Sequence, residues 1–280
     1  MKFVSYIYHG KSSYGLVNND QILDLGERIG TLYPDLKSFL HCHDMEQILK
    51  PYINDEYTIN INEITYLPVI PNPSKIICAG MNFKDKKKEY NVSTNYLITF
   101  IRFNDTQTGH NQILLKPRLS QQFDYEGELA VIIGKEGYQI KHNNAMDYIA
   151  GYSCYMDASV RDWQHTCFTA GKNWLKTGGF GPYLITKDEI TDIEKLSIST
   201  YVNGKQLQND LINNMIFSIP QIIEYISTFT KLSVGDVIVT GSPGGSGKHR
   251  SPPIFLKEGD IVEVDIPNIG KLKNFVIEQQ

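Results

Sequence analysis

The ten residues 124–133 constrain this chain more than any other segment. Leu129 to Ile133 are continuously apolar, which is typical of a buried strand. Glu126 and Glu128 come just before this run, and side chains at i and i+2 of a strand point to the same face. Two like charges beside a buried strand repel each other and resist desolvation. A divalent cation is the simplest compensating charge; the alternative is a solvated edge strand, and the pair alone does not decide between them.

The overall composition excludes several classes of function. With 280 residues, a net charge of -4 and a pI near 6.0, the chain gives no reason to expect nucleic acid or an anionic membrane as a partner. No window approaches the ~18 apolar residues of a membrane span. The four cysteines are scattered without zinc-type spacing, which favours reduced thiols. We therefore expect a soluble, cytoplasmic protein.

The chain divides at a proline-rich segment. Three prolines within residues 68–73 exclude both helix and ladder pairing, so this segment is a linker between residues 1–66 and 67–280. We expect residues 1–66 to form a small N-terminal α/β unit. Its expected elements are strands at Phe3–Tyr8 and Tyr14–Val17, a turn at 10–13 between them and a short helix within 36–49.

Short strand-like runs recur after the linker, and helices are few. This pattern favours an α+β, β-rich core over a βαβ repeat. The expected strands are 75–79, 113–115, 129–133, 183–185, 198–202, 237–239 and 261–266. A helix is predicted from Ser218, with Pro220 in its first turn and an apolar face of Ile222, Ile223, Ile226 and Phe229. A shorter helix with a capping box is predicted at 144–147.

A third acid strengthens the metal interpretation. Asp157 follows an apolar, strand-like approach and precedes Arg161, Asp162 and Gln164. Three carboxylates with open positions beside them suit a hard cation, Mg²⁺ or Mn²⁺, and Ca²⁺ less well. No histidine or cysteine cluster competes for zinc or iron.

Two further features are candidates for binding an anion. Lys172 precedes a glycine-rich turn at 178–182; a lone lysine is usually solvated, but beside a metal it can stabilise an enolate or oxyanion. The turn at 240–247 follows a buried strand, and its N–H groups and the Ser242 hydroxyl could bind a carboxylate. A plain flexible loop is the alternative. The turn lacks the Gly-Lys-Ser/Thr ending of a phosphate loop, which argues against nucleotide binding.

Together these motifs resemble the fumarylacetoacetate hydrolase family. The resemblance implies a mixed β-sandwich roll of the fumarylacetoacetase C-terminal type. It also implies a homodimer with Mg²⁺ or Mn²⁺ that chelates a 2-oxo acid or β-diketone. The matching blocks cover most of the chain after the linker: 75–83, 124–134, 151–164, 171–172, 181–182, 202–204, 232–247, 255–260 and 270–274.

The resemblance also implies roles for single residues. Glu126, Glu128 and Asp157 match the metal ligands, and Lys172 matches the active-site lysine. The positions that match or fit substrate-binding residues are Arg161, Gln164, Ser242 and Arg102. Ser242 stands in place of the usual threonine. Arg102, together with His110 and Pro117, fits a branch of the family with a longer Arg-Phe loop.

Two departures from the family pattern bear on the last chemical step. Hydrolytic and decarboxylating members often have a histidine and a glutamate three residues apart, which activate water. Glu89 is present as a catalytic candidate, but Lys86 stands in place of the histidine. It lies in a run of four lysines in five positions, which is expected to be solvated. Leu175 stands where members often have aspartate, and His110 is an alternative base.

The sequence thus predicts a divalent-metal-dependent enzyme that acts on a small 2-oxo acid or β-diketo acid through an enolate. Hydrolysis of a C–C bond, decarboxylation, tautomerisation or isomerisation, and dehydration all remain open, although the missing histidine weakens hydrolysis. The alternative is a catalytically reduced member that binds metal and an oxo-acid ligand as a sensor or accessory protein. In that case the lysine-rich run 84–88 is a surface feature.

Overall fold

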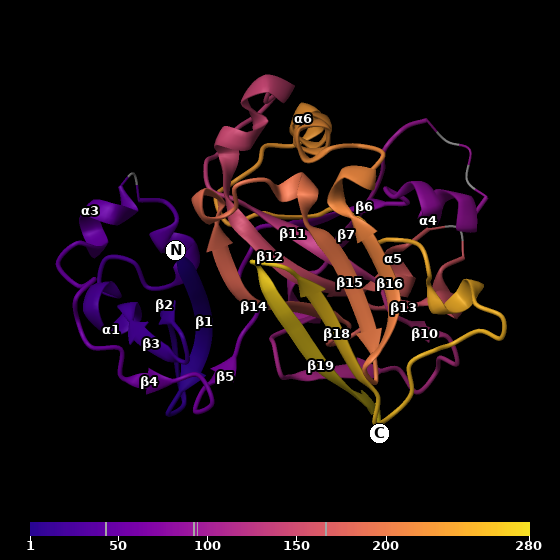
Figure 1. Cartoon of the computed structure of the whole chain (residues 1–280), viewed down its shortest axis with the longest axis horizontal. Helices are drawn as coiled ribbons and strands as arrows, with labels where there is room; N and C mark the ends of the chain where they lie inside the picture. The colour runs from indigo at the N-terminus through magenta and orange to yellow at the C-terminus, as the bar shows by residue number, and fades with distance from the viewer. Residues whose placement is uncertain (43, 92, 94, 166) are drawn as a thin grey trace.

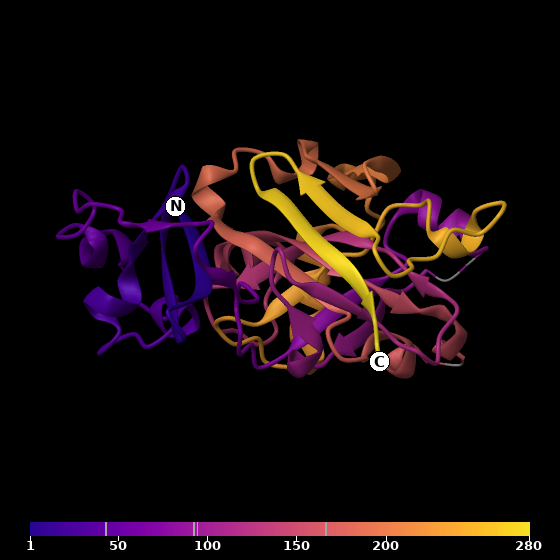
Figure 2. The same cartoon turned by 90° about the horizontal axis from the view of Figure 1, so that it is seen from below.

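The computed structural model describes residues 1–42, 44–91, 93, 95–165 and 167–280. Within these residues most strands belong to two sheets, which Figures 1 and 2 show from two sides. The main path of the larger sheet runs β4 (Ile59–Asn60), β3 (Gln21–Asp24), β2 (Lys11–Asn18), β1 (Lys2–Tyr8), β14 (Gly178–Thr186), β12 (Ile149–Asp157), β11 (Gly127–Ile133), β17 (Val237–Val239), β6 (Ile76–Gly80) and β7 (Ile98–Arg102). Two short strands join it from the side, β5 (Thr65–Tyr66) on β1 and β8 (Gln107–Thr108) on β14.

The smaller sheet packs against the centre of the larger one. Its order is β16 (Lys205–Leu211), β15 (Ser197–Val202), β18 (Ile261–Ile266), β19 (Gly270–Glu278) and β9 (Ile113–Lys116). A separate pair is formed by β10 (Phe123–Asp124) and β13 (Ser159–Val160). The α-helices are α1 (Leu25–Ile29), α2 (Leu36–Phe39), α3 (Met45–Leu49), α4 (Lys84–Glu89), α5 (Thr169–Lys172) and α6 (Ile219–Phe229). Short 3₁₀ helices are η1 (Asn104–Thr106), η2 (His142–Tyr148), η3 (Arg161–Trp163), η4 (Lys187–Glu189), η5 (Ile193–Lys195), η6 (Ile212–Asn214) and η7 (Gly247–His249).

The strand β11 lies in the middle of the larger sheet and is buried on both faces. It pairs with β12 on one side and β17 on the other. Leu129 and Val131 pack into the core between the two sheets, whereas Ala130 and Ile132 pack into the core on the opposite face. Alternating side chains thus enter two different cores, which is why the whole run is apolar.

The N-terminal unit shares the larger sheet with the rest of the chain. Strand β1 pairs antiparallel with β14, with Phe3 opposite Leu184. The expected strands there are present, but the turn is shorter than predicted because β2 already begins at Lys11, opposite Tyr8. The single helix expected within 36–49 is instead the two short helices α2 and α3. The division at residues 66 and 67 stays a prediction.

The helix predictions were right for one segment and wrong for another. Helix α6 has the capping box of Ser218 and Gln221, but Phe229 is 58% exposed. Phe229 lies four residues after the exposed Tyr225 and contacts its ring at 5.7 Å between centroids, so it belongs to the outer face. The segment 144–147 lies in the 3₁₀ helix η2, which has no side-chain cap. No helix in the described residues is long and apolar enough to cross a membrane.

Candidate metal centre

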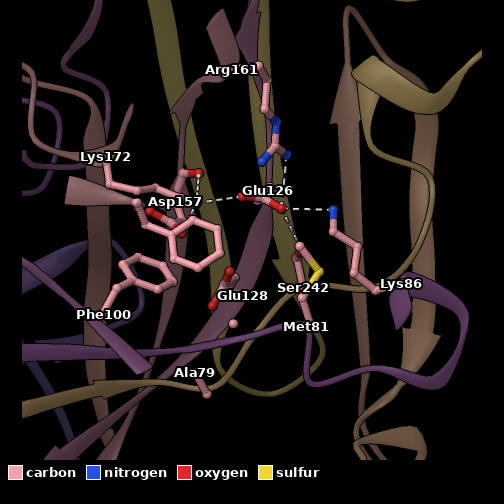
Figure 3. A pocket seen from close by; sticks show the side chains of 12 residues that line it. Ala79, Met81, Lys86, Phe100, Glu126, Glu128, Asp157, Arg161, Lys172 and Ser242 are labelled. Atoms are coloured by element: carbon pink, nitrogen blue, oxygen red, sulfur yellow. Dashed lines mark hydrogen bonds and ion pairs between the residues drawn. The ribbon is translucent and has the colours of Figure 1, made fainter. Parts of the chain in front are cut away.

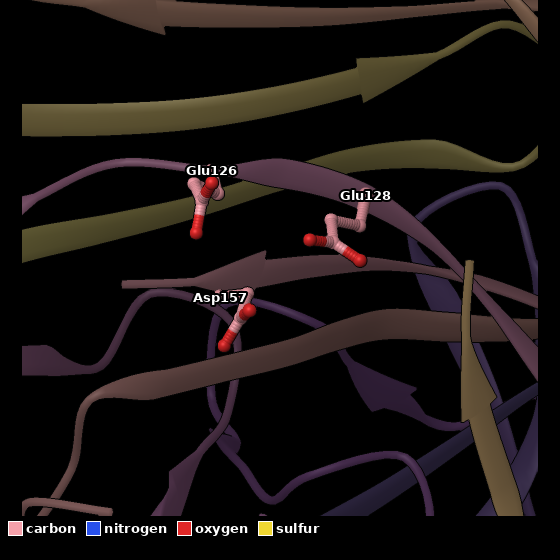
Figure 4. Close-up of side chains that lie close together, drawn as sticks. All are labelled: Glu126, Glu128 and Asp157. Carbon is pink, nitrogen blue, oxygen red and sulfur yellow. The ribbon is translucent and has the colours of Figure 1, made fainter. Parts of the chain in front are cut away.

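Three carboxylates meet at the ends of two paired strands (Figure 4). Glu126 directly precedes β11, Glu128 lies within it, and Asp157 is the last residue of β12. One oxygen of each carboxylate lies within 4.8 Å of the others, and all three side chains are buried. The structure therefore brings the three predicted acids together. The alternative of a solvated edge strand is wrong, because β11 has a partner on each side.

Glu126 is surrounded by cations. Its Oε2 lies 2.5 Å from Lys172 Nζ. Its Oε1 lies 2.8 Å from Lys86 Nζ and 3.0 Å from Arg161 Nη2. Burial alone disfavours the ionised carboxylate, but Arg161, Lys172 and Lys86 outweigh it and hold the pKa of Glu126 well below its usual range. Side chains of the protein thus supply part of the compensating charge that the sequence assigned to a metal.

Asp157 is held from two sides. Arg102 Nη1 donates to its Oδ1 at 2.5 Å, and the ammonium of Lys172 contacts its Oδ2. Burial opposes the charge on Lys172, yet Asp157 and Glu126 outweigh it and raise the pKa of the lysine. Lys172 is therefore a charged donor placed between two of the three acids.

Glu128 has a different environment from the other two acids. Its Oε2 accepts a hydrogen bond of 2.7 Å from the N–H of Gly241, and it makes no ion pair within the described residues. Burial, followed by the charges of Asp157 and Glu126, raises its pKa well above the usual value. A buried carboxylate without an ion pair in the described residues, facing two other carboxylates, fits a hard divalent ion such as Mg²⁺ or Mn²⁺.

Lys86 is not solvated, contrary to the prediction for the lysine-rich run. Its side chain is 2% exposed and is the only buried one in α4, whereas Lys84 and Lys88 on the same helix are exposed. Lys86 points toward Glu126, with Tyr90 one turn further along facing its ammonium at 5.1 Å. Lysine composition alone does not show which position of a short helix faces the core, so the prediction is wrong at Lys86.

The predicted substrate-binding residues have different surroundings. Arg161 faces the carboxylates, with its Nε donating to Asp124 Oδ2 at 2.8 Å and its Nη1 to Gln164 Oε1 at 3.1 Å. We therefore expect Gln164 to position Arg161. Arg102 is buried behind Asp157, where it also donates to Thr177 Oγ1 at 2.7 Å. We expect Arg102 to orient Asp157 rather than to contact a substrate.

The turn at 240–247 binds carboxylates that belong to the site itself. The Ser242 hydroxyl donates to Glu126 Oε1 at 3.3 Å, and the N–H of Gly241 donates to Glu128 as described above. The backbone N–H of Gly247 donates to Asp124 Oδ1 at 2.8 Å. The turn therefore fixes the acids in place, which the sequence could not distinguish from binding an external anion.

A small cavity opens onto the three acids (Figure 3). Among its lining residues, Phe100 and Phe168 form an apolar wall with ring centroids 5.1 Å apart, and neither was singled out from the sequence. No histidine lines the cavity within the described residues. The lining residues are Ala79, Gly80, Met81, Lys86, Phe100, Glu126, Glu128, Asp157, Arg161, Phe168, Lys172 and Ser242.

The two candidate bases lie in different places. Glu89 does not line this cavity but lines a neighbouring pocket with His249 and Arg250. Its Oε2 is buried, lacks a hydrogen-bond donor within the described residues and lies 4.0 Å from Nζ of Lys86, which lines the cavity. His110 lies elsewhere, packed against Tyr66, and its Nδ1 accepts the N–H of Lys273 at 3.1 Å. Because the structure does not place His110 at the cavity, it is not the base that replaces the missing histidine.

Comparison with known proteins gives a consistent picture. The model of the fumarylacetoacetate (FAA) hydrolase C-terminal family matches residues 75–277. A mitochondrial oxaloacetate tautomerase of Xenopus laevis is 37% identical over 271 residues, covering 94% of this chain and 84% of that protein. The fumarylacetoacetate hydrolase of Exiguobacterium antarcticum has a TM-score of 0.79 at 29% identity over the whole of both chains.

A third match concerns the fold alone. The maleylpyruvate hydrolase of Sphingobium sp. SYK-6, solved with manganese(II) and pyruvate, has a TM-score of 0.83 at 23% identity over the whole of both chains. The strand-rich architecture and these structural matches confirm the predicted fold class. From the matched model and the identity to the tautomerase, the chain belongs to the fumarylacetoacetate hydrolase family.

Proposed function

We propose that the protein catalyses the keto–enol interconversion of a small 2-oxo acid with the help of a divalent metal. The observation that carries this proposal is the buried triad of Glu126, Glu128 and Asp157 with the Lys172 ammonium between two of its members. Mg²⁺ or Mn²⁺ held by these carboxylates would polarise the keto and carboxylate oxygens of the substrate and lower the cost of removing a proton from C3.

The residues around the triad would share the remaining work. Lys172 keeps a positive charge beside the position where negative charge develops on the oxygen of the enolate. Phe100 and Phe168 keep water from one side of the cavity, which strengthens these electrostatic contacts. Arg102 and Gln164 hold Asp157 and Arg161 in position from behind.

Glu89 is the proposed acceptor of the C3 proton. Its Oε2 is buried without a hydrogen-bond donor within the described residues, and it lies 4.0 Å from the ammonium of Lys86, which lines the cavity. A carboxylate with an unused lone pair can take a proton and return it to the neighbouring oxygen, as tautomerisation requires. C–C hydrolysis is less well supported because no histidine of the described chain lines the cavity to activate water.

The experiment is a tautomerase assay with oxaloacetate, the substrate named for the Xenopus relative. The decay of enol absorbance is followed in water with Mg²⁺ or Mn²⁺ present. We expect wild-type protein to accelerate ketonisation, Lys172→Met to abolish most of the acceleration, and removal of metal to stop it. If the protein binds metal and oxalate but accelerates nothing, the catalytically reduced sensor or accessory protein becomes the better description.

Three finer expectations complete the proposal. Mn²⁺ or Mg²⁺ is preferred over Ca²⁺, because three carboxylates leave positions for water and substrate rather than a cage of six to eight oxygens. We expect a homodimer, which native mass spectrometry tests. We also expect a cytoplasmic protein, in keeping with four free cysteines, which cell fractionation tests.

A further inference from the structure

Lys86 is a buried ammonium with unused donors. Its Nζ lies 2.8 Å from Glu126 Oε1 and 4.0 Å from Glu89 Oε2, and it faces the ring of Tyr90 at 5.1 Å. An ammonium carries three N–H donors, yet none of them meets an acceptor in hydrogen-bond geometry within the described residues. Burying such a group without full pairing is costly, which indicates that another anion belongs near it.

The other cations that line the cavity are already engaged. The Lys172 ammonium contacts carboxylate oxygens of both Glu126 and Asp157. Arg161 uses its Nε on Asp124 and its Nη1 on Gln164, in addition to facing Glu126. These two side chains hold the protein's own groups in place. Among the lining residues that the structure describes, Lys86 Nζ and Arg161 Nη2 have donors left for a ligand. Arg161 is held by Asp124 and Gln164, whereas Lys86 donates to no protein group in hydrogen-bond geometry.

The position of Lys86 also separates it from the keto end of a ligand. In Figure 3, Lys86 approaches Glu126 from the side opposite Lys172 and Asp157. A 2-oxo acid chelated beside the three acids would have Lys172 near one end and Lys86 near the other. If the keto end of such a ligand lies beside Lys172, the free donors of Lys86 would face the part of the ligand beyond C3.

We infer that Lys86 binds a second carboxylate of the substrate, so that the protein prefers 2-oxo dicarboxylates over 2-oxo monocarboxylates. This inference rests on the proposed function. A lysine ammonium offers three N–H donors and forms charge-assisted hydrogen bonds with carboxylates, whereas a neutral imidazole at the same position would offer a single donor. Lys86 would thereby determine specificity, with Glu89, the proposed proton acceptor, on the next turn of the same helix.

Pyruvate and oxaloacetate make a matched pair for the test, because they differ by one carboxylate on C3. Calorimetry measures the Kd of each for the Mn²⁺-loaded protein. We expect wild-type protein to bind oxaloacetate at least about tenfold more tightly than pyruvate. Lys86→Met should raise the Kd of oxaloacetate by about 10- to 100-fold and leave the Kd of pyruvate within about twofold of the wild-type value. Lys86→Arg, which keeps the charge, should retain most of the preference.

Lys88→Met is the control, because Lys88 is 80% exposed on the same helix and should leave both Kd values unchanged. Melting temperatures establish that each variant is folded, and Lys86→Gln replaces Lys86→Met if the latter unfolds. If Lys86→Met raises the Kd of both ligands equally, or changes neither Kd, the inference is overturned while the proposed function stays intact. Wild-type protein that takes up Mn²⁺ but binds neither ligand contradicts the proposed function itself.

A second readout does not involve a substrate. Lys86 lies beside Glu126, so its positive charge opposes a divalent cation at the same carboxylate. Mn²⁺ affinity of Lys86→Met should therefore equal or exceed that of wild-type protein. A Lys86→Met protein that is folded but has lost Mn²⁺ would mean that the lysine only supports the metal site, and this outcome also overturns the inference.

Discussion

The backbone N–H of Asp157 donates to the backbone carbonyl of Glu126 over 2.8 Å. This bond joins the end of β12 to the start of β11, so acids 31 positions apart in sequence are placed by strand pairing rather than by a loop. Sites built on strands are positioned more precisely than sites built on loops. Substitution of Glu128, the acid of the three without an ion pair in the described residues, should therefore change metal binding with little change in fold.

Glu128→Gln should separate metal binding from stability. The amide oxygen can still accept the N–H of Gly241, while the buried ionisable carboxyl that faces Asp157 and Glu126 is removed. We expect Mn²⁺ affinity to fall by about 100-fold or more, and the free energy of unfolding measured with EDTA to be unchanged or higher. Mn²⁺ titration and urea denaturation of the same preparation measure both quantities. Unchanged Mn²⁺ affinity would show that Glu128 is not a ligand.

Arg102→Met should mainly destabilise the protein. Its guanidinium donates to Asp157 Oδ1 and to Thr177, and both contacts are buried. Removing one member of a buried ion pair costs about 3–5 kcal/mol. Urea denaturation should show a loss of this size, and Arg102→Lys a smaller one. A variant that keeps wild-type stability but raises KM for oxaloacetate would instead support the substrate-binding role predicted from sequence.

Acid should destabilise the protein through His110. Burial, with a smaller effect of Lys273, lowers the pKa of His110 to about 4. Nδ1 of His110 accepts a hydrogen bond from the backbone N–H of Lys273, and a protonated ring could not accept this bond. The unfolded state, with a pKa of about 6.5, binds a proton first as the pH falls. The contribution of neutral His110 to the free energy of unfolding is therefore complete above pH ~6.5. It is lost as the pH falls toward ~4, and the loss is at most about 3 kcal/mol.

Equilibrium unfolding at a series of pH values measures this effect, and His110→Gln is the matched variant because glutamine does not titrate. The difference in stability between wild type and His110→Gln should shrink as the pH falls through this window. A difference that stays constant from pH ~7 to ~4.5 would show that His110 titrates normally in the folded protein.

Two positions of helix α6, one buried and one exposed, should differ in how much a substitution lowers the free energy of unfolding. Ile226 is fully buried, whereas Phe229 is 58% exposed on the outer face. Ile226→Ala should cost about 2–4 kcal/mol, and Phe229→Ser should stay within about 0.5 kcal/mol of wild type. Chemical denaturation of the two variants gives the comparison. Equal losses would mean that Phe229 is covered in solution, for example by a second copy of the chain.

The sequence predicted the acids of the site better than the groups that hold them. Glu126 and Glu128 could be placed because the period of two in a strand fixes the face of each side chain, and the apolar run after them fixes its burial. The contacts of Lys86 and Arg102 could not be predicted, because their partners Glu126 and Asp157 are distant in the chain and only the fold brings them together. Long-range pairing leaves no local pattern in the sequence.

Local signals also had limits where tertiary contacts overrode them. Residues 178–182 contain three glycines and read as a turn, yet they lie in the central strand β14. A Cβ on Gly178 would lie 2.1 Å from Gln107 Oε1, so glycine is needed there for close packing rather than for a turn. The sequence also gave no sign that β1 would pair with β14 across the proline-rich linker.

Hydrogen exchange at C3 tests the central claim most directly. Oxaloacetate is incubated in D₂O with Mg²⁺ and wild-type protein, with Glu126→Gln protein, or with wild-type protein and EDTA, and the C3 protons are followed by NMR against the spontaneous rate. Metal-assisted enolisation at the three carboxylates predicts fast exchange only for wild-type protein with Mg²⁺. Exchange at the spontaneous rate in all samples, or equally fast exchange with Glu126→Gln, would contradict it.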